Sequence, residues 1–185
     1  ADHGTINGSK VLDVQKQGNT LVHYMDKANF KAGEEVTVTL DFERRENISR
    51  HHSATHVMIA TLSKVFGPHV WQAGSKKEDD VAHVDFTHFE KPSTEQMNEV
   101  ERRANQIVLE GRPIFTREED RGAAEEKHGF RIYQGGGAIS NKLRLVEIKD
   151  YDVECCGGTH RTNTSQIGLI KIVSVENIKD GVMRV

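Results

Sequence analysis

Cysteine and long hydrophobic runs are both scarce in this sequence of 185 residues. No stretch approaches the roughly 20 consecutive apolar residues that a helix needs to cross a bilayer, so we predict no membrane span. The only cysteines, Cys155 and Cys156, are adjacent and therefore cannot build an ordinary disulfide framework. They indicate a reducing, cytoplasmic compartment, where cysteines more often bind metal or react.

The beginning of the chain lacks the features of a secretory signal. Residues 1–4 carry neither a basic region nor an apolar core, and no initiator Met is present. We therefore expect either a processed start or a segment taken from a longer protein.

The composition is typical of a soluble globular protein. Hydrophobic residues make up 36% of the chain and charged residues 29%. The 25 Lys and Arg against 28 Asp and Glu give a formal net charge of −3, and the 10 histidines are more than a neutral surface requires. The length allows one large domain, or one medium domain with a small partner.

Short strands dominate the first part of the chain. Turn residues separate β-branched, alternating stretches, which lie at 10–14, 20–24 and 35–40. Several short strands between tight turns are typical of a small barrel or curled sheet. We therefore predict a partial β-barrel-like domain over 1–43.

Helices and strands both follow, and we predict a second domain over 44–185. Helices are expected at 48–66, from Ser93 to about 110, and at 117–127; Ser93 and Gln96 stand in capping-box spacing at the start of the second one. Strands are expected at 70–73, 81–86, 130–133, 143–148, 151–154, 169–173 and 181–185. Because strand runs and helix runs are segregated, the predicted fold class is α+β rather than a doubly wound sheet.

Two histidines stand in the first turns of the first predicted helix. His52 and His56 are four residues apart, so both imidazoles leave one face of that helix about one turn apart. This spacing lets two nitrogens reach one metal ion, as in helical zinc sites. In a chain this rich in histidine, a chance pair is the alternative.

A second group of candidate ligands lies about 100 residues later, in Cys156-Gly-Gly-Thr-His160. Glycines can fold the thiolate and the imidazole back onto one point, since glycine reaches backbone angles that other residues avoid. Together with His52 and His56 they make a four-ligand set of the kind zinc prefers. The alternative is a buried structural cysteine beside an unrelated turn. Four protein ligands normally mean a closed structural site, whereas catalytic zinc keeps one position open.

These motifs resemble the editing domain of alanyl-tRNA synthetases, which also occurs in free-standing alanyl-tRNA editing proteins. Threonyl-tRNA synthetases carry a related domain, but Thr159 and the segment after Gln72 favour the alanyl branch. The resemblance spans essentially the whole chain. The matching segments are His52-Ser-Ala-Thr-His56, Cys156-Gly-Gly-Thr-His160, Gln72-Ala-Gly-Ser75, Val84-Asp-Phe-Thr-His-Phe89, Leu143-Arg-Leu-Val-Glu-Ile148 and, in the archaeal form, the stretch 129–136.

The resemblance implies a zinc ion held by His52, His56, Cys156 and His160, in a cleft that admits the 3′ end of an aminoacylated tRNA. It implies an aminoacyl-tRNA ester hydrolase that clears seryl-tRNA(Ala) and glycyl-tRNA(Ala), as the proofreading part of an alanine–tRNA ligase in protein biosynthesis. A synthetic pocket for alanine cannot strongly reject glycine, or serine with its single extra hydroxyl, so discrimination must be repeated at a second, hydrolytic site.

Gln72 is the candidate catalytic residue. Its neutral amide can donate and accept hydrogen bonds at once, which suits orienting a water or the aminoacyl group beside an ester carbonyl. The alternative is that Gln72 only closes a hydrogen bond at a strand end. The zinc itself either activates water through an open position, or holds the cleft together while the ester's neighbouring hydroxyl assists.

Two other functional classes stay open. A zinc-stabilised tRNA-binding module without its own chemistry is the main rival; a metallopeptidase-like hydrolase is disfavoured because no Glu follows His52. The net charge of −3 is low for a tRNA partner, although a domain that handles only the terminal nucleotides needs few phosphate contacts. Arg144, Arg161 and Lys171 are candidates for those contacts.

The chain departs from the family pattern in two places. A Gly-Gly-Gln stretch usual in the family is missing upstream of residue 1, so we expect a fragment with an incomplete barrel. Cys155 is an extra thiol beside a candidate ligand. It is either a surrogate ligand or a small buried residue, and we favour the latter.

Overall fold

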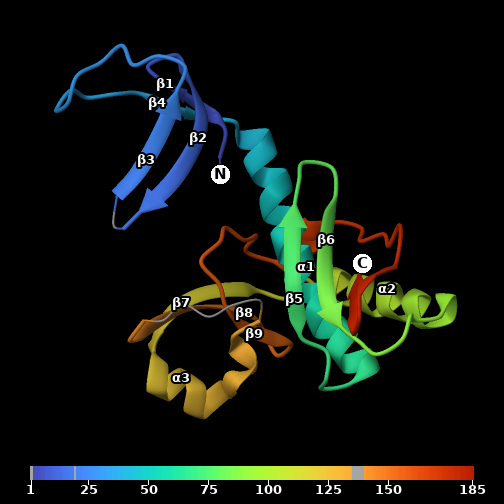
Figure 1. Ribbon diagram of the computed structural model, residues 1–185. Coiled ribbons are helices and arrows are strands. Elements are labelled where there is room, and N and C mark those ends of the chain that lie inside the picture. Colours follow the sequence, from blue (N-terminus) through green and yellow to red (C-terminus); the bar gives the residue numbers. More distant parts are fainter. Residues whose placement is uncertain (1, 19, 135–139) are drawn as a thin grey trace. The chain divides into compact units, whose positions relative to one another are not determined.

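The computed structural model describes residues 2–18, 20–134 and 140–185, and these form two compact units, 1–48 and 49–185 (Figure 1). The glycine run at 135–137, part of the stretch that resembles the archaeal synthetases, lies outside the described residues. The longest helix, α1 (Phe42–Phe66), contributes residues to both units.

The first unit contains an antiparallel sheet with the strand order β3-β2-β1-β4. Its strands are β1 (Gly4–Ile6), β2 (Ser9–Gln17), β3 (Thr20–Met25) and β4 (Val38–Leu40). Gly4 is packed so tightly on β4 that a β-carbon would lie 2.1 Å from the carbonyl oxygen of Thr39. Among the described residues β3 and β4 are unpaired edges, so the predicted barrel-like closure is wrong. Four short strands are fewer than even the smallest common barrels use.

Helix α1 begins six residues before the predicted start at Ile48. Asp41 supplies the cap, because its side chain accepts a hydrogen bond from the Arg44 backbone N–H at 3.1 Å. The polar run 44–47, which reads as a break in the sequence, therefore lies within the first two helical turns. The helix ends at Phe66, directly before the predicted stop at Gly67-Pro68.

The described residues of the second unit form two antiparallel sheets and, besides α1, two helices of at least eight residues. One sheet has the order β10-β11-β6-β5, and the other has the order β7-β8-β9. The strands are β5 (Gln72–Lys77), β6 (Ala82–Thr87), β7 (Ile114–Asp120), β8 (Lys142–Ile148), β9 (Asp152–Cys155), β10 (Glu176–Lys179) and β11 (Val182–Arg184). The helices are α2 (Thr94–Leu109) and α3 (Arg121–His128).

The main hydrophobic core joins α1 and α2 to both sheets. Its fully buried side chains include Val57, Leu62, Phe86, Val100 and Ile148. The capping box predicted at Ser93 and Gln96 is confirmed, since each side chain bonds the other's backbone N–H. The named strands pair only antiparallel, and helices packed against antiparallel sheets are the α+β arrangement, so the α+β class is confirmed.

Three predicted elements differ from the structure. Residues 117–120 extend β7, and α3 begins only after Asp120, whose side chain caps the Gly122 N–H. The predicted strand at 130–133 is a short 3-10 helix, Phe130–Ile132, and a second one spans Thr164–Ile167. The segment 169–173 is not a strand and pairs with no strand in the described chain.

Side chains of α2 take the place of a strand beside the segment 169–173. Asn105 bonds both the N–H and the carbonyl of Ile170, at 2.9 and 2.8 Å. Glu101 accepts the N–H of Ile172 at 2.7 Å. The alternating apolar pattern thus marks a segment that a helix, rather than a sheet, stabilises.

Candidate metal centre

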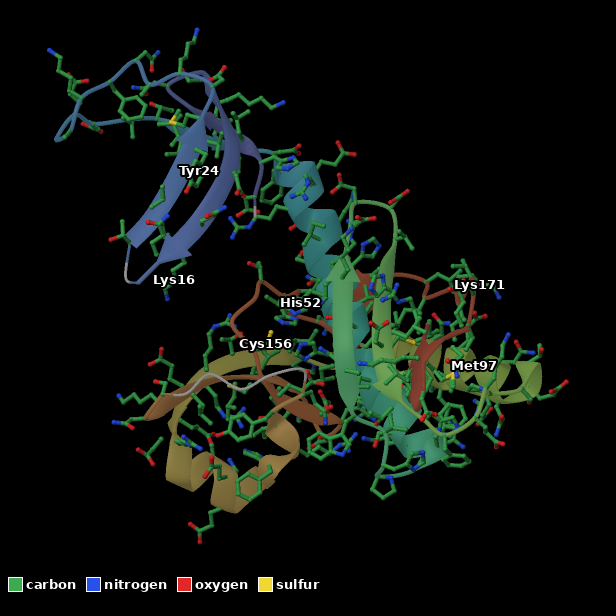
Figure 2. All side chains as sticks on the ribbon, viewed as in Figure 1. Lys16, Tyr24, His52, Met97, Cys156 and Lys171 are labelled. Carbon is green, nitrogen blue, oxygen red and sulfur yellow. The ribbon has the colours of Figure 1, made fainter. Side chains whose placement is uncertain are left out.

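Four side chains from two distant parts of the sequence meet in the second unit. His52 and His56 come from α1, and Cys156 and His160 come from the loop after β9; one potential ligand atom from each lies within 4.8 Å of the others. The Sγ atom of Cys156 is 3.3 Å from Nε2 of His52 and 3.4 Å from Nε2 of His160. Figure 2 shows His52 and Cys156 facing one another across this site. The structure therefore brings together all four residues singled out by spacing.

The loop after β9 is held close to α1. The backbone N–H of Cys156 bonds the carbonyl of Arg144, which continues the pairing of β8 with β9. The Arg144 guanidinium also donates to the Cys156 carbonyl. Gly158 then passes directly over the His52 ring, where a β-carbon would lie 2.1 Å from Cε1. Close approach, rather than a left-handed backbone angle, requires glycine at this position.

The electrostatics keep the three imidazoles neutral at pH 7. Burial, together with nearby positive charge, lowers the pKa of His52 to about 4 and that of His160 to about 3. Burial also lowers the pKa of His56 well below its usual value. Neutral imidazoles offer lone pairs to a metal without first losing a proton.

Burial raises the pKa of the Cys156 thiol, while the Gly158 N–H, Lys77 and Arg144 oppose that shift. The three imidazoles have ring centroids 4.0 to 5.3 Å apart, and the cluster is only partly buried, with His56 fully covered and the other three residues half-buried. With an ion, the three imidazoles and the thiol are a nitrogen and sulfur donor set of the type that zinc prefers. The residues present therefore fit a zinc ion.

Two of the imidazoles have neutral hydrogen-bond partners outside the cluster. Nδ1 of His160 lies 3.2 Å from the hydroxyl of Ser53, which also accepts the Arg161 N–H at 2.9 Å. The backbone carbonyl of Thr159 accepts a hydrogen bond from the His52 ring. Such outer contacts fix the tautomer and ring orientation of a ligand.

Gln72 is not one of the clustered residues but begins a polar row along β5. Its side-chain Nε2 is 3.5 Å from the hydroxyl of Ser75, which accepts from Lys77 Nζ at 2.6 Å. The charge of Lys77 acts on all four candidate ligands. The backbone N–H of Gln72, not its side chain, makes the strand-end hydrogen bond, to Oε1 of Gln134 at 2.9 Å.

Sequence reasoning missed the role of Ser75 and Lys77, because simple alternation would separate them from Gln72. A register shift between Gln72 and Gly74 changes the alternation along β5. The burial pattern follows, with Gln72, Ser75 and Lys77 half-buried and the two residues Ala73 and Lys76 exposed. A bulge of this kind has no clear signal in a single sequence apart from the glycine.

Of the other residues singled out in the sequence, some lie at this site and some lie elsewhere. Arg144 lies beside the cluster through its bond to Cys156, whereas Lys171 pairs with Glu101 on α2 at 2.8 Å. Cys155 packs against a small second core that includes Leu143 and Leu145, and it is not one of the four clustered residues.

Comparisons with known proteins identify relatives of the whole chain. Residues 143–185 match the second additional domain of threonyl and alanyl tRNA synthetases. Alanine–tRNA ligase of Methanococcus vannielii is 47% identical over 184 residues, which are 99% of this chain and 21% of the ligase. The chain is homologous to archaeal alanine–tRNA ligases. The alanine–tRNA ligase of Pyrococcus abyssi is 45% identical over 183 residues, and that of Hyperthermus butylicus 45% over 175 residues.

Homology to the alanine–tRNA ligases confirms the resemblance that the motifs indicate. The match to the Pyrococcus abyssi ligase includes 97% of this chain but only 20% of the ligase. The match to the Hyperthermus butylicus ligase includes 95% of this chain and 19% of the ligase. The domain match contains Cys156 and His160, whereas His52, His56 and Gln72 lie outside it and inside the longer match. No helix of the described residues has the length and apolar character to cross a membrane.

Proposed function

We propose that this chain hydrolyses the ester bond of seryl-tRNA(Ala) and glycyl-tRNA(Ala), as the zinc-dependent proofreading part of an alanine–tRNA ligase in the cytoplasm. Residues 44–185 carry this editing activity, and 1–43 form a separate small domain. The observation that carries the proposal is the convergence of His52, His56, Cys156 and His160 on one point, in a relative of the alanine–tRNA ligases.

The four clustered side chains would hold the zinc ion. When bound, zinc supplies a Lewis acid next to the ester of the terminal nucleotide. All other chemistry comes from the side chains around it. The site needs only the acceptor end of the tRNA, which is compatible with the net charge of −3.

Two cationic side chains, Lys77 and Arg144, lie near the cluster. Lys77 and Arg144 both act on Cys156 and on the imidazoles of His52 and His160. Fixed cations of this kind stabilise the negative charge that develops on an ester oxygen during hydrolysis. They also disfavour a second cation, so the site is suited to the carbonyl rather than the ammonium end of the aminoacyl group.

Gln72 orients the reacting groups. Its side-chain amide has one long contact, 3.5 Å to Ser75, so its oxygen and remaining N–H are available to a water or an aminoacyl group. A neutral amide places a water without removing its proton. Ser75 holds Gln72 and Lys77 on the same side of β5.

A tRNA-binding module without chemistry is the second candidate, and the four protein ligands favour it. A fully ligated zinc is normally structural. The two proposals differ in one measurement, the release of serine from seryl-tRNA(Ala) by the purified chain, with alanyl-tRNA(Ala) as the control substrate. Hydrolysis of the seryl ester but not the alanyl ester supports editing. Binding of both tRNAs without hydrolysis, at micromolar protein, contradicts it and supports the module.

A further inference from the structure

His56 differs from the other two clustered histidines in its surroundings. The residue is 3% exposed, and its Nδ1 makes no hydrogen bond within the part of the chain that the structure describes. The nearest acceptors are Oε2 of Glu154 at 3.4 Å and Oδ2 of Asp152 at 4.0 Å. A buried ring nitrogen without a partner costs free energy, so this arrangement calls for a physical reason.

The two carboxyl groups come from the strand that also delivers the thiol. Glu154 lies in β9, is 2% exposed and precedes Cys156 by two residues. Its Oε1 and the Oδ2 of Asp152 are also buried and unbonded in the described chain. The segment 154–156 therefore meets the His56 ring in two ways. Its Cys156 thiol lies in the cluster with His56, and its Glu154 carboxyl group lies beside the Nδ1 of the same ring.

The other two rings have weaker acceptors. Ser53 offers a hydroxyl to His160, and Thr159 offers a backbone carbonyl to His52. Both groups are neutral. An imidazole that donates Nδ1–H to a carboxyl oxygen presents Nε2 as a lone pair in a fixed direction, and an ionised carboxylate is a stronger acceptor than a hydroxyl or a backbone carbonyl. His56 is therefore the ring whose tautomer the protein controls most directly.

We propose that Glu154 is a positioning residue, whose Oε2 accepts the Nδ1 proton of His56 and fixes the tautomer that presents Nε2 to the metal. With a metal held by the cluster, the 3.4 Å contact between Nδ1 and Oε2 would serve as this hydrogen bond. Asp152 lies beside the same ring nitrogen, with its Oδ2 4.0 Å from the Nδ1 of His56. This inference rests on the proposed zinc site.

The test compares Glu154→Leu and Glu154→Gln with the surface control Glu126→Gln in the zinc-loaded chain. Zinc affinity is measured by competition with a chelator, and the His56 tautomer by long-range ¹H–¹⁵N correlation. We expect Glu154→Leu to weaken zinc binding about 10- to 100-fold and to release the tautomer of His56. Glu154→Gln keeps an acceptor oxygen and should retain the tautomer with a smaller loss of affinity.

Three results distinguish a failure of the proposed role of Glu154 from a failure of the proposed zinc site. Wild-type zinc affinity and an unchanged tautomer in folded Glu154→Leu overturn the role of Glu154 while leaving the zinc site intact. A lower melting temperature with both readouts unchanged also overturns it, since the residue would then be structural only. A wild-type chain that binds no zinc contradicts the proposed metal centre itself, and with it this inference.

Discussion

A β-carbon on Gly158 would lie 2.1 Å from Cε1 and 2.5 Å from Nδ1 of His52. Real β-carbons do not approach other atoms so closely, and the backbone at Gly158 is not in the left-handed region. Any side chain there must therefore push the His52 ring or lift the loop that carries Cys156 and His160. Gly158 is therefore the residue whose missing side chain lets the two ligand segments touch.

We expect Gly158→Ala to weaken zinc binding by about tenfold or more, as displacing a ligand's surroundings commonly does. Gly157→Ala is the matched control, because a β-carbon at Gly157 meets nothing within 4 Å. Chelator competition on both variants, with melting curves to verify folding, checks this. Equal affinities in the two variants would show that the close approach has no influence on the site.

The sequence predicts the ligand set because each half of it is a local feature. The four-residue spacing of His52 and His56 needs only a helix, and glycines between Cys156 and His160 need only a turn. The capping box at Ser93 is equally local, and it is confirmed. Whether the two halves meet in space depends on tertiary packing. The motif resemblance, rather than the spacing, predicted that they meet.

Elements governed by distant contacts were harder to predict. The barrel-like prediction failed because closure depends on strands that pair far along the chain, and the described sheet ends at β3 and β4. The polar row on β5 depends on a bulge that alters alternation after Gln72. Glu154 carries no motif at all, since its meaning comes from His56, almost 100 residues earlier.

We expect one zinc ion per chain. Cys156→Ala removes the only sulfur among the clustered ligand atoms and should abolish most of the bound metal. Cys155→Ala is the control, because Cys155 packs with Leu143 and Leu145 in a separate small core. Elemental analysis of the purified proteins gives the ratio. Full zinc retention by Cys156→Ala would mean either that Cys155 is the sulfur ligand or that the zinc site is not at this cluster.

Zinc binding at pH 7 should release about one proton per ion, and the apparent affinity should rise about tenfold per pH unit from pH 6 to 8. The proton comes from Cys156, whose raised pKa keeps the thiol protonated. The imidazoles of His52 and His160, with pKa values of about 4 and 3, are already neutral. They compete for protons only below about pH 4, where the dependence steepens.

Calorimetry in buffers of different ionisation enthalpy counts the released protons. Cys156→Ser should reduce the count to near zero while weakening zinc binding. A release near three protons at pH 7 would mean that the imidazoles are charged before the metal binds, and would contradict the effect of burial on them.

Asn105 should matter for stability far more than its place on a helix surface indicates. Its amide bonds both backbone groups of Ile170, so Asn105→Ala leaves a donor and an acceptor without these partners. We expect the free energy of unfolding to fall by about 1–3 kcal/mol, measured in urea. Asn98→Ala, at an exposed position of the same helix, should change it by less than about 0.5 kcal/mol. Similar losses of unfolding free energy in both variants would show that the segment 169–173 is stabilised by packing alone.

Gln72 tests whether the site performs chemistry or only binds. Its side chain lies in the polar row with Ser75 and Lys77 and is not one of the clustered ligands. Gln72→Ala should therefore leave zinc content and melting temperature unchanged. If the amide orients the reacting groups, hydrolysis of seryl-tRNA(Ala) should fall about 100-fold, a usual loss when one positioned donor is removed. Gln106→Ala, an exposed glutamine on α2, should hydrolyse at the wild-type rate. Wild-type rates in Gln72→Ala would remove this residue from the mechanism and leave the ester's neighbouring hydroxyl as the group that assists.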